Sequence, residues 1–299
     1  MSITVSHLTH IYHQGSPAER TALSDMNLVI HEGSITAIIG VTGSGKSTLV
    51  QHFNGLLRPS HGEVQVDDIS VTSDTGAEDL RTLRRKVGLV FQFPESQLFA
   101  ATVYDDVAFG PRQLGLSPSE ISTRVMDALR AVALEPTESL LTRSPFALSG
   151  GQRRRVAIAG TLAMHPAYLV LDEPSAGLDA EARDQLYAAL TALRESLGIT
   201  IIMVTHDMVE VSELADYLYV LCDGKVELAG QPAEVFRHAR EIMSAGLLPP
   251  PLTEVVTLAQ SHGLIGHVES IDINTVAEAI RRARQPNASS YANPEPPAC

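Results

Sequence analysis

The chain has 299 residues, of which 44% are hydrophobic, and its formal net charge is −13. This length and apolar content suit one large globular domain, with or without a small appendage. The acidic balance argues against a broad nucleic-acid-binding surface, which needs clustered Lys and Arg, although a local basic patch is compatible with it.

Along the chain, apolar runs alternate with segments of helical periodicity, which is typical of a mainly parallel sheet flanked by helices. Short early strands predict an antiparallel subdomain, at residues 3–8, 26–30 and 63–66. Core strands are expected at 35–39, 87–91, 168–171, 200–204 and 217–221. Core helices are expected at 46–57, 150–164, 180–197 and 208–214. Asp223-Gly224 favours a hairpin turn into a last strand at 225–228.

The segment from about 94 to 150 differs from the rest, because it shows helical periodicity and no strong strand. Its clearest helix is predicted over 119–133, with start signals at Ser117-Pro118 and Ser119. We therefore expect a helical insertion there.

The end of the chain is predicted to form a separate extension, residues 236–299, after a main domain of residues 1–235. A proline-rich break at 247–251 precedes short helices at 252–260 and 276–284. Residues 285–299 are rich in Pro, Asn, Ser and Ala, a composition that favours disorder.

Three further features of the sequence indicate the cellular compartment of the protein. No stretch approaches the roughly 18–20 uninterrupted apolar residues that span a bilayer, and the N-terminus shows no signal-peptide pattern. The two cysteines, Cys222 and Cys299, provide neither a disulfide framework nor zinc spacing. We therefore expect a soluble intracellular protein, for which any membrane role would have to come through a partner.

Residues 40–47, Gly-Val-Thr-Gly-Ser-Gly-Lys-Ser, match the phosphate-binding pattern G-x-x-x-x-G-K-[ST] between a predicted strand and a predicted helix. The glycines let backbone amides turn toward an anion, and the helix directs its positive end to the same place. Lys46 would reach the β- and γ-phosphates, and the Ser47 hydroxyl would bind Mg²⁺. A chance glycine-rich turn is disfavoured by the flanking elements. The expected nucleotide contacts are Gly40, Thr42, Gly43, Ser44, Gly45, Lys46, Ser47 and Thr48.

Asp172 and Glu173 follow a buried strand at the edge of the sheet where ligands bind in open α/β folds. Asp172 could bind Mg²⁺ directly or through water, and Glu173 could take a proton from an attacking water. A solvated strand end is the plainer alternative, but the phosphate-binding loop favours the catalytic role.

Leu148-Ser149-Gly150-Gly151-Gln152 opens a predicted helix that Ser149 is placed to cap, so that its free amides offer a second anion site. Here the chain resembles the ATP-binding cassette (ABC) ATPases, whose signature is LSGGQ. The resemblance covers residues 1–235. It implies an α/β P-loop NTPase fold of the ABC type: a RecA-like core with an antiparallel β-subdomain and a helical subdomain, followed here by the small C-terminal helical extension. It also implies that Ser149, Gly150, Gly151 and Gln152 meet the γ-phosphate of ATP bound to the opposite subunit of a dimer.

The same resemblance assigns roles to four more residues. Taken alone, Gln92 could be a plain surface glutamine, His206 a structural histidine and Tyr12 a core aromatic residue. Gln92 is similar to the Q-loop glutamine, which contacts Mg²⁺ and the attacking water. Asp179 ends Ser-Ala-Gly-Leu-Asp, which resembles the D-loop at the dimer interface. His206 resembles the switch histidine that contacts the γ-phosphate, and Tyr12 the aromatic residue that stacks on adenine.

Finer features resemble the energy-coupling factor (ECF) transporters, which import vitamins or transition-metal ions. These features are the segments 91–99, 102–111, 157–160 and 246–251, of which the first is a groove for coupling helices in that family. The stretches 15–20, 40–45 and 51–56 look like the second of the two ATPase types of that family. The resemblance implies ATP and Mg²⁺ as ligands, a peripheral position on the cytoplasmic face of the membrane, and three partners: a transmembrane coupling subunit, a substrate-binding membrane subunit and a second ATPase, identical or not.

Other functions are open at this point: an ABC ATPase of another importer class, one associated with nucleic acid, or a binding-only regulatory module. Nucleic-acid-associated relatives have a long coiled-coil insertion or two cassettes in one chain, and this chain has neither. Arg153-Arg154-Arg155 spread over different faces of a helix, so we expect a solvated or interface-facing stripe rather than a nucleic-acid site. A binding-only module is disfavoured because Glu173 and His206 are both present.

Overall fold

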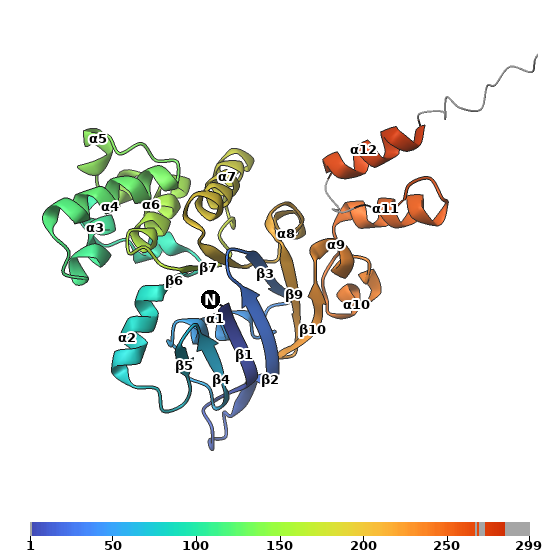
Figure 1. Ribbon diagram of the computed structural model, residues 1–299, viewed down its shortest axis with the longest axis horizontal. Helices are drawn as coiled ribbons and strands as arrows, with labels where there is room; N and C mark the ends of the chain where they lie inside the picture. The colour runs from blue at the N-terminus through green and yellow to red at the C-terminus, as the bar shows by residue number, and fades with distance from the viewer. Residues whose placement is uncertain (1, 267, 269–272, 285–299) are drawn as a thin grey trace, which may run out of the picture.

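The structure, a computed structural model, describes residues 2–266, 268 and 273–284 (Figure 1). The disorder expected for 285–299 and the terminal Cys299 therefore lie outside the described residues. A six-stranded sheet runs through the centre, in the order β10-β9-β3-β8-β7-β6. Its strands are β3 (Ile35–Gly40), β6 (Val87–Val90), β7 (Tyr168–Asp172), β8 (Thr200–Val204), β9 (Tyr217–Cys222) and β10 (Lys225–Gly230). All neighbours pair in parallel except β9 and β10, which form the expected antiparallel hairpin.

The three central strands are apolar along their length because both faces of the sheet are covered. Every residue of β3, β7 and β8 is buried, as is usual in parallel sheets that have helices on both sides. At the hairpin, both Asp223 (φ +46°) and Gly224 (φ +74°) have the positive φ that a tight two-residue turn requires.

A second, antiparallel sheet forms the subdomain predicted from the early strands, in the order β2-β1-β4-β5. Its strands are β1 (Ser2–Tyr12), β2 (Arg20–His31), β4 (His61–Val66) and β5 (Ile69–Val71). Helix α1 (Lys46–Phe53) lies between the two sheets, and its fully buried Leu49 and Phe53 belong to one apolar cluster with residues of both. This packing fixes the start of α1 beside the carboxyl ends of the central strands.

The segment 94–150 is helical, as the sequence predicts, and Figure 1 shows it as a lobe beside β6 and β7. It contains η1 (Pro94–Gln97), α3 (Val103–Gln113), α4 (Pro118–Ala131), α5 (Glu138–Leu141) and η2 (Pro145–Ala147), and it leads into α6 (Gly150–Leu162). Apolar residues of α3, α4, α6 and of α7 (Ala180–Leu197) form one core with β7 and β8. Helix α8 (Met208–Leu214) packs on the same face of the sheet, beside β3 and β9, and α1 with the antiparallel sheet covers the opposite face.

Some boundaries differ from the prediction. Helix α1 ends at Phe53 rather than at 57, because Gly55 has a left-handed backbone (φ +66°) that ends the helix. Helix α2 (Ala77–Lys86) was not predicted, since most of its ten residues are polar or charged and only Leu80 and Leu83 are buried. Strand β5 and the short helices α9 (Pro232–Val235) and α10 (Ala239–Ser244) were also missed.

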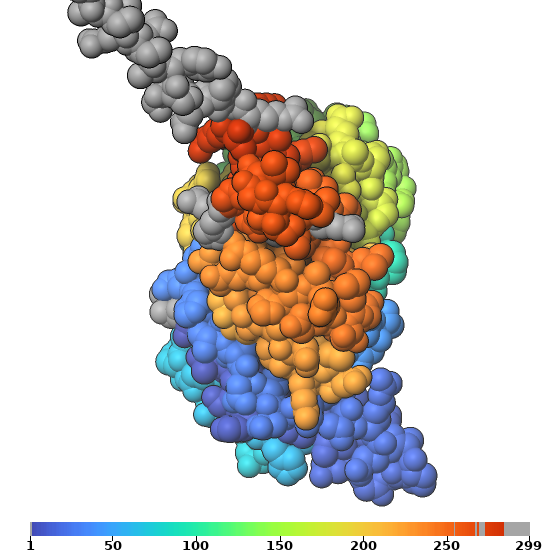
Figure 2. Space-filling view, turned by 90° about the vertical axis from the view of Figure 1, so that its right-hand side faces the viewer, coloured from blue at the N-terminus to red at the C-terminus, as the bar shows by residue number. Residues whose placement is uncertain are grey.

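The extension contains α10, α11 (Pro251–Ser261) and α12 (Ile273–Arg284), and Figure 2 shows the face of the molecule that it covers together with α9. Buried Phe236, Ile242, Val256 and Val276 share an apolar cluster with Val220 of β9. Within the described residues, no helix combines the length and the apolar character needed to cross a bilayer.

Candidate active site

A cavity lies at the carboxyl ends of β3, β6 and β7, where it also meets the antiparallel sheet. The residues lining it are Tyr12, Arg20, Ala22, Thr42, Gly43, Gly45, Lys46, Ser47, Thr48, Gln92, Asp172 and Glu173. The open edge of a parallel α/β sheet is the usual place for a ligand. The structure thus brings most of the predicted site residues together.

The loop from β3 to α1 follows a tight path that only glycine permits at two positions. Gly45 has φ +103°, and a Cβ there would lie 2.7 Å from Leu23 Cδ2 and 2.8 Å from the carbonyl oxygen of Ala22. At Gly40, a Cβ would lie 2.4 Å from Ser44 Oγ. The first amides of α1 have no acceptor within the helix, so this path presents several N–H donors and a helix N-terminus to one anion.

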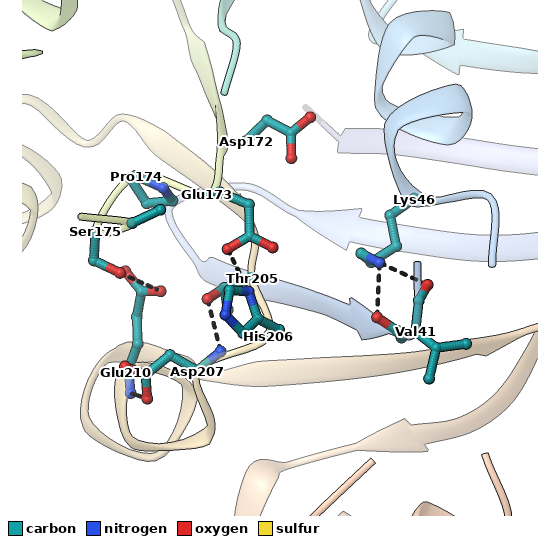
Figure 3. Close-up of polar contacts among 12 residues, drawn as sticks. Val41, Lys46, Asp172, Glu173, Pro174, Ser175, Thr205, His206, Asp207 and Glu210 are labelled. Atoms are coloured by element: carbon teal, nitrogen blue, oxygen red, sulfur yellow. Dashed lines mark hydrogen bonds and ion pairs between the residues drawn. The ribbon is translucent and has the colours of Figure 1, made fainter. Parts of the chain in front are cut away.

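Side chains at the loop also fit a phosphate tail with a divalent cation. Lys46 Nζ donates hydrogen bonds to the carbonyls of Gly40 (2.7 Å) and Val41 (3.0 Å) (Figure 3). Burial lowers the Lys46 pKa, and the carboxylates Glu173 and Asp172 oppose this shift. Ser44 Oγ is buried and has no hydrogen-bond partner among the described residues, so a donor is free inside the loop.

Two oxygen groups lie together where Mg²⁺ is expected. Ser47 Oγ donates to Asp172 Oδ2 at 3.0 Å, from the start of α1 to the end of β7. Burial raises the Asp172 pKa, and the hydrogen bond from Ser47 lowers it. A hydroxyl and a carboxylate are hard oxygen donors of the kind Mg²⁺ binds, so these residues fit the ion.

Glu173 has an unusual backbone and a close partner. Its φ of +52° is in the left-handed region, which is uncommon for non-glycine residues, and its backbone N–H donates to Val204 O at 2.8 Å. His206 Nδ1 lies 2.7 Å from Glu173 Oε2 (Figure 3), with 71% of the His206 side chain exposed and 13% of the Glu173 side chain. The histidine does not line the cavity, but this contact connects it to the carboxylate that does.

The signature residues form a separate group on the same chain. The side chain of Ser149 accepts a hydrogen bond from Gln152 N (3.3 Å), and Gln152 Oε1 accepts one from Ser149 N (3.2 Å), so the predicted cap is present at the start of α6. Asp179 caps α7 through Ala182 N at 2.8 Å. Neither Asp179 nor any residue of 149–152 is among those that line the cavity.

A further depression, called here the lateral groove, is lined by mainly apolar residues of β6, α3 and α6 and the segment after β6. Phe99 and Phe109 lie in it with 61% and 46% of their surface exposed, and their rings meet edge to face at 5.0 Å. Residues from 91–99, 102–111 and 157–160 all line the groove. The fold therefore brings residues 157–160 beside the neighbouring segments 91–99 and 102–111, which are distant from them in the sequence, to form one surface.

Comparison with known proteins agrees with this geometry. A family described as "ABC transporter" matches residues 23–176, just over half of the chain. The chain is 46% identical over 263 residues to the energy-coupling factor transporter ATP-binding protein EcfA2 of Clostridium tetani, with 88% of this chain and 90% of that protein covered. It is 47% identical over 281 residues to EcfA2 of Streptococcus agalactiae, with 94% and 99% covered.

The chain belongs to the ATP-binding proteins of energy-coupling factor transporters. It is therefore an ABC ATPase, an ATP-hydrolysing transport subunit, as the signature and the segments around the lateral groove predict. Among solved structures it is similar to cbiO1 from Clostridium perfringens, described as part of the ABC transporter complex cbiONQ (TM-score 0.72, 40% identity, 85% of this chain and 98% of that one covered). It is also similar to the cassette MJ0796 in a dimeric post-hydrolysis state bound to ADP and Pi (TM-score 0.68, 33% identity, 77% and 98% covered). The α/β P-loop fold of the ABC type is thus confirmed.

Two residues of this ATPase site were not predicted. Arg20 and Ala22 line the cavity from β2, where Arg20 pairs with Tyr12 across the two strands. Tyr12 also contacts α1, since its hydroxyl lies 3.2 Å from Thr48 Oγ1. Nothing near Arg20 in the sequence indicates this position, because only the pairing of β1 with β2 brings it to the cavity.

The interpretation of Arg153-Arg154-Arg155 as a solvated or interface-facing stripe was wrong for Arg154. Its side chain is only 3% exposed, and the neighbouring Arg155 donates to Ala133 O at 3.2 Å. Three successive residues of a helix span about 200° around its axis, so a stripe of three can include one residue that faces the core.

Proposed function

We propose that this ATPase works in a head-to-tail dimer, on the cytoplasmic face of the membrane, and energises an importer of vitamins or transition-metal ions. One observation carries the dimer: the cavity gathers Lys46, Asp172 and Glu173, whereas Ser149 and its helix start lie apart from it. A γ-phosphate in the cavity would therefore need a second subunit to supply its signature contacts, either a copy of this chain or a sister ATPase.

In this proposal each residue of the cavity has a defined task. The glycine loop and Lys46 bind the phosphates, the ring of Tyr12 stacks on adenine, and Ser47, Asp172 and Gln92 bind Mg²⁺. When bound, the ion would neutralise charge on the β- and γ-phosphate oxygens. Glu173 accepts a proton from the attacking water.

His206 and the interface residues complete the site. Because Nδ1 of His206 lies 2.7 Å from Glu173 Oε2, the imidazole orients that carboxylate while its exposed ring reaches toward the γ-phosphate. Gly150, Gly151 and Gln152 join Ser149 in closing the opposite subunit's site, with Asp179 at the interface. Closure then depends on ATP binding the closed dimer more tightly than the open one.

The lateral groove is the proposed docking surface for the transmembrane coupling subunit, which in turn would carry a substrate-binding membrane subunit. Exposed aromatic side chains in a concave apolar groove suit the apolar face of a partner helix. The relative cbiO1 from Clostridium perfringens is described as part of the ABC transporter complex cbiONQ, which supports this proposal. In this proposal the ATPase domain comprises residues 1–235, with its helical part at about 94–150, and residues 236–299 form the extension.

Co-purification with measurement of Mg²⁺-dependent ATP turnover tests this function. We expect an integral-membrane subunit to co-purify with the tagged chain, and a Phe99→Glu variant to lose it while retaining basal ATP hydrolysis. Leu197→Glu is the matched control, because Leu197 is 63% exposed but lies outside the groove. Bound nucleic acid in place of a membrane subunit, or the absence of Mg²⁺-dependent turnover, would refute the proposal.

A further inference from the structure

Arg154 is a buried cation in the first turns of the signature helix α6. Only 3% of its side chain is exposed, although it lies between the less buried Arg153 and Arg155. A buried charge is costly unless it is paired and hydrogen-bonded, so the contacts of this guanidinium are informative.

One contact reaches the segment that follows β6. Arg154 Nε lies 3.5 Å from Glu95 Oε2, on the short helix η1. This oxygen is buried and accepts no hydrogen bond within the part of the chain that the structure describes, so the guanidinium is its charge partner. Gln97 and Leu98 of the same segment line the lateral groove. Any partner that displaces η1 from the groove side would therefore move the carboxylate that faces Arg154.

The other contacts reach the loop that follows Glu173. Arg154 Nη1 donates to the carbonyl oxygens of Pro174 (2.9 Å) and Ala176. The amide of Ala176 in turn donates to the carbonyl of Glu173 at 3.3 Å. One planar group thus contacts Glu95 through Nε and the loop between Glu173 and the start of α7 through Nη1, with two nitrogens that arginine provides and lysine does not.

We propose that Arg154 is a positioning residue that transmits movement of η1 to the loop 174–176, and so adjusts Glu173 when a partner occupies the lateral groove. The inference rests on the proposed function, because it takes Glu173 as the base and the groove as the docking surface. Arg154 does not line the nucleotide cavity. Its loss should therefore change the response of turnover to the partner and leave the affinity for ATP unchanged.

Two variants interrupt the connection at different points. Glu95→Gln removes the charge on η1 and leaves both bonds from Arg154 to the loop. Arg154→Lys retains a positive charge, but its single nitrogen cannot take the places of both Nε beside Glu95 and Nη1 beside the loop. Asp127→Asn is the matched control, because Asp127 pairs with Arg130 at 3.2 Å on the surface of the same lobe, with both side chains more than half exposed.

The experiment measures kcat and KM for ATP with and without the co-purified membrane subunits, together with the melting temperature. We expect the partner-dependent stimulation of kcat to fall about 2- to 30-fold in Glu95→Gln and Arg154→Lys, the range that coupling mutations span. The value of KM, the turnover without the partner and the stimulation in Asp127→Asn should stay at the wild-type level. The double variant should lose no more than the stronger single one, since both act on one connection.

The remaining outcomes show whether the positioning role of Arg154 or the proposed function is wrong. Wild-type stimulation in both single variants overturns the positioning role, and so does an equal loss of turnover with and without the partner, which indicates a purely structural arginine. Glu173→Gln is measured in parallel. If that variant hydrolyses ATP at the wild-type rate, the proposed function is wrong rather than the coupling through Arg154.

Discussion

Replacing Glu173 by glutamine exchanges one carboxylate oxygen for an amide nitrogen and hardly changes the volume of the side chain. The side chain is 13% exposed and lies 2.7 Å from His206 Nδ1, so it has a defined position that glutamine can also adopt. The backbone strain at φ +52° is the same for both residues. The substitution therefore tests the charge and basicity of the side chain rather than its packing.

The expected loss follows from the role of the carboxylate. A positioned general base contributes about 10²- to 10⁴-fold to a rate, which corresponds to about 3–5 kcal/mol in the activation barrier. Binding should not weaken, because Glu173 is a negative charge near Lys46 and hence near the phosphates that Lys46 would contact. Nucleotide affinity should stay constant or increase, and ATP should accumulate in a closed dimer.

Steady-state phosphate release gives kcat, equilibrium titration with a fluorescent ATP analogue gives the affinity, and light scattering with ATP gives the mass of the complex. Glu195→Gln is the control, since Glu195 is an exposed residue near the far end of α7. A variant that releases phosphate at the wild-type rate, or that loses nucleotide affinity together with kcat, would refute the assigned role of Glu173.

The other predictions concern binding, the signature and pH. Lys46→Ala should raise the dissociation constant for ATP by about 10- to 100-fold, the value of a hydrogen bond to a charged group, and unchanged titration curves would contradict this. Ser149→Ala and Ser117→Ala each remove a complete capping box, so urea unfolding should show that each lowers the unfolding free energy by about 1 kcal/mol. Only Ser149→Ala should also reduce ATP turnover. Equal turnover in the two variants would argue against a signature role for Ser149. Burial raises the pKa of Glu210 from its ordinary value of 4.5 to about 7. Because the native state keeps this proton at pH values where the unfolded chain releases it, the unfolding free energy should fall by roughly 3 kcal/mol between about pH 4 and 8 from this group. Glu210→Gln should flatten that part of the curve, and identical pH profiles would show that the group does not titrate in this range.

Features that depend on neighbouring residues could be predicted well. The phosphate-binding loop, the cap at Ser149 and the hairpin at Asp223-Gly224 are local, because their backbone geometry follows from glycines and from side chains within three residues. The core strands were also predicted closely, since burial on both faces leaves a continuous apolar run. Helix α2 left no such signal, because only Leu80 and Leu83 of its residues are buried.

Sequence alone thus determined the family, the order of the core elements and nearly all residues of the candidate site, since contiguous motifs and apolar runs identify them. The tertiary structure decided the features that require contact between segments distant in the sequence. It placed Arg20 beside Tyr12 through the pairing of β1 with β2, and it gathered three separate segments into the lateral groove. It also turned Arg154 inward to Glu95 and to the loop after Glu173, because the face of a helix that becomes buried is settled only by what packs against it.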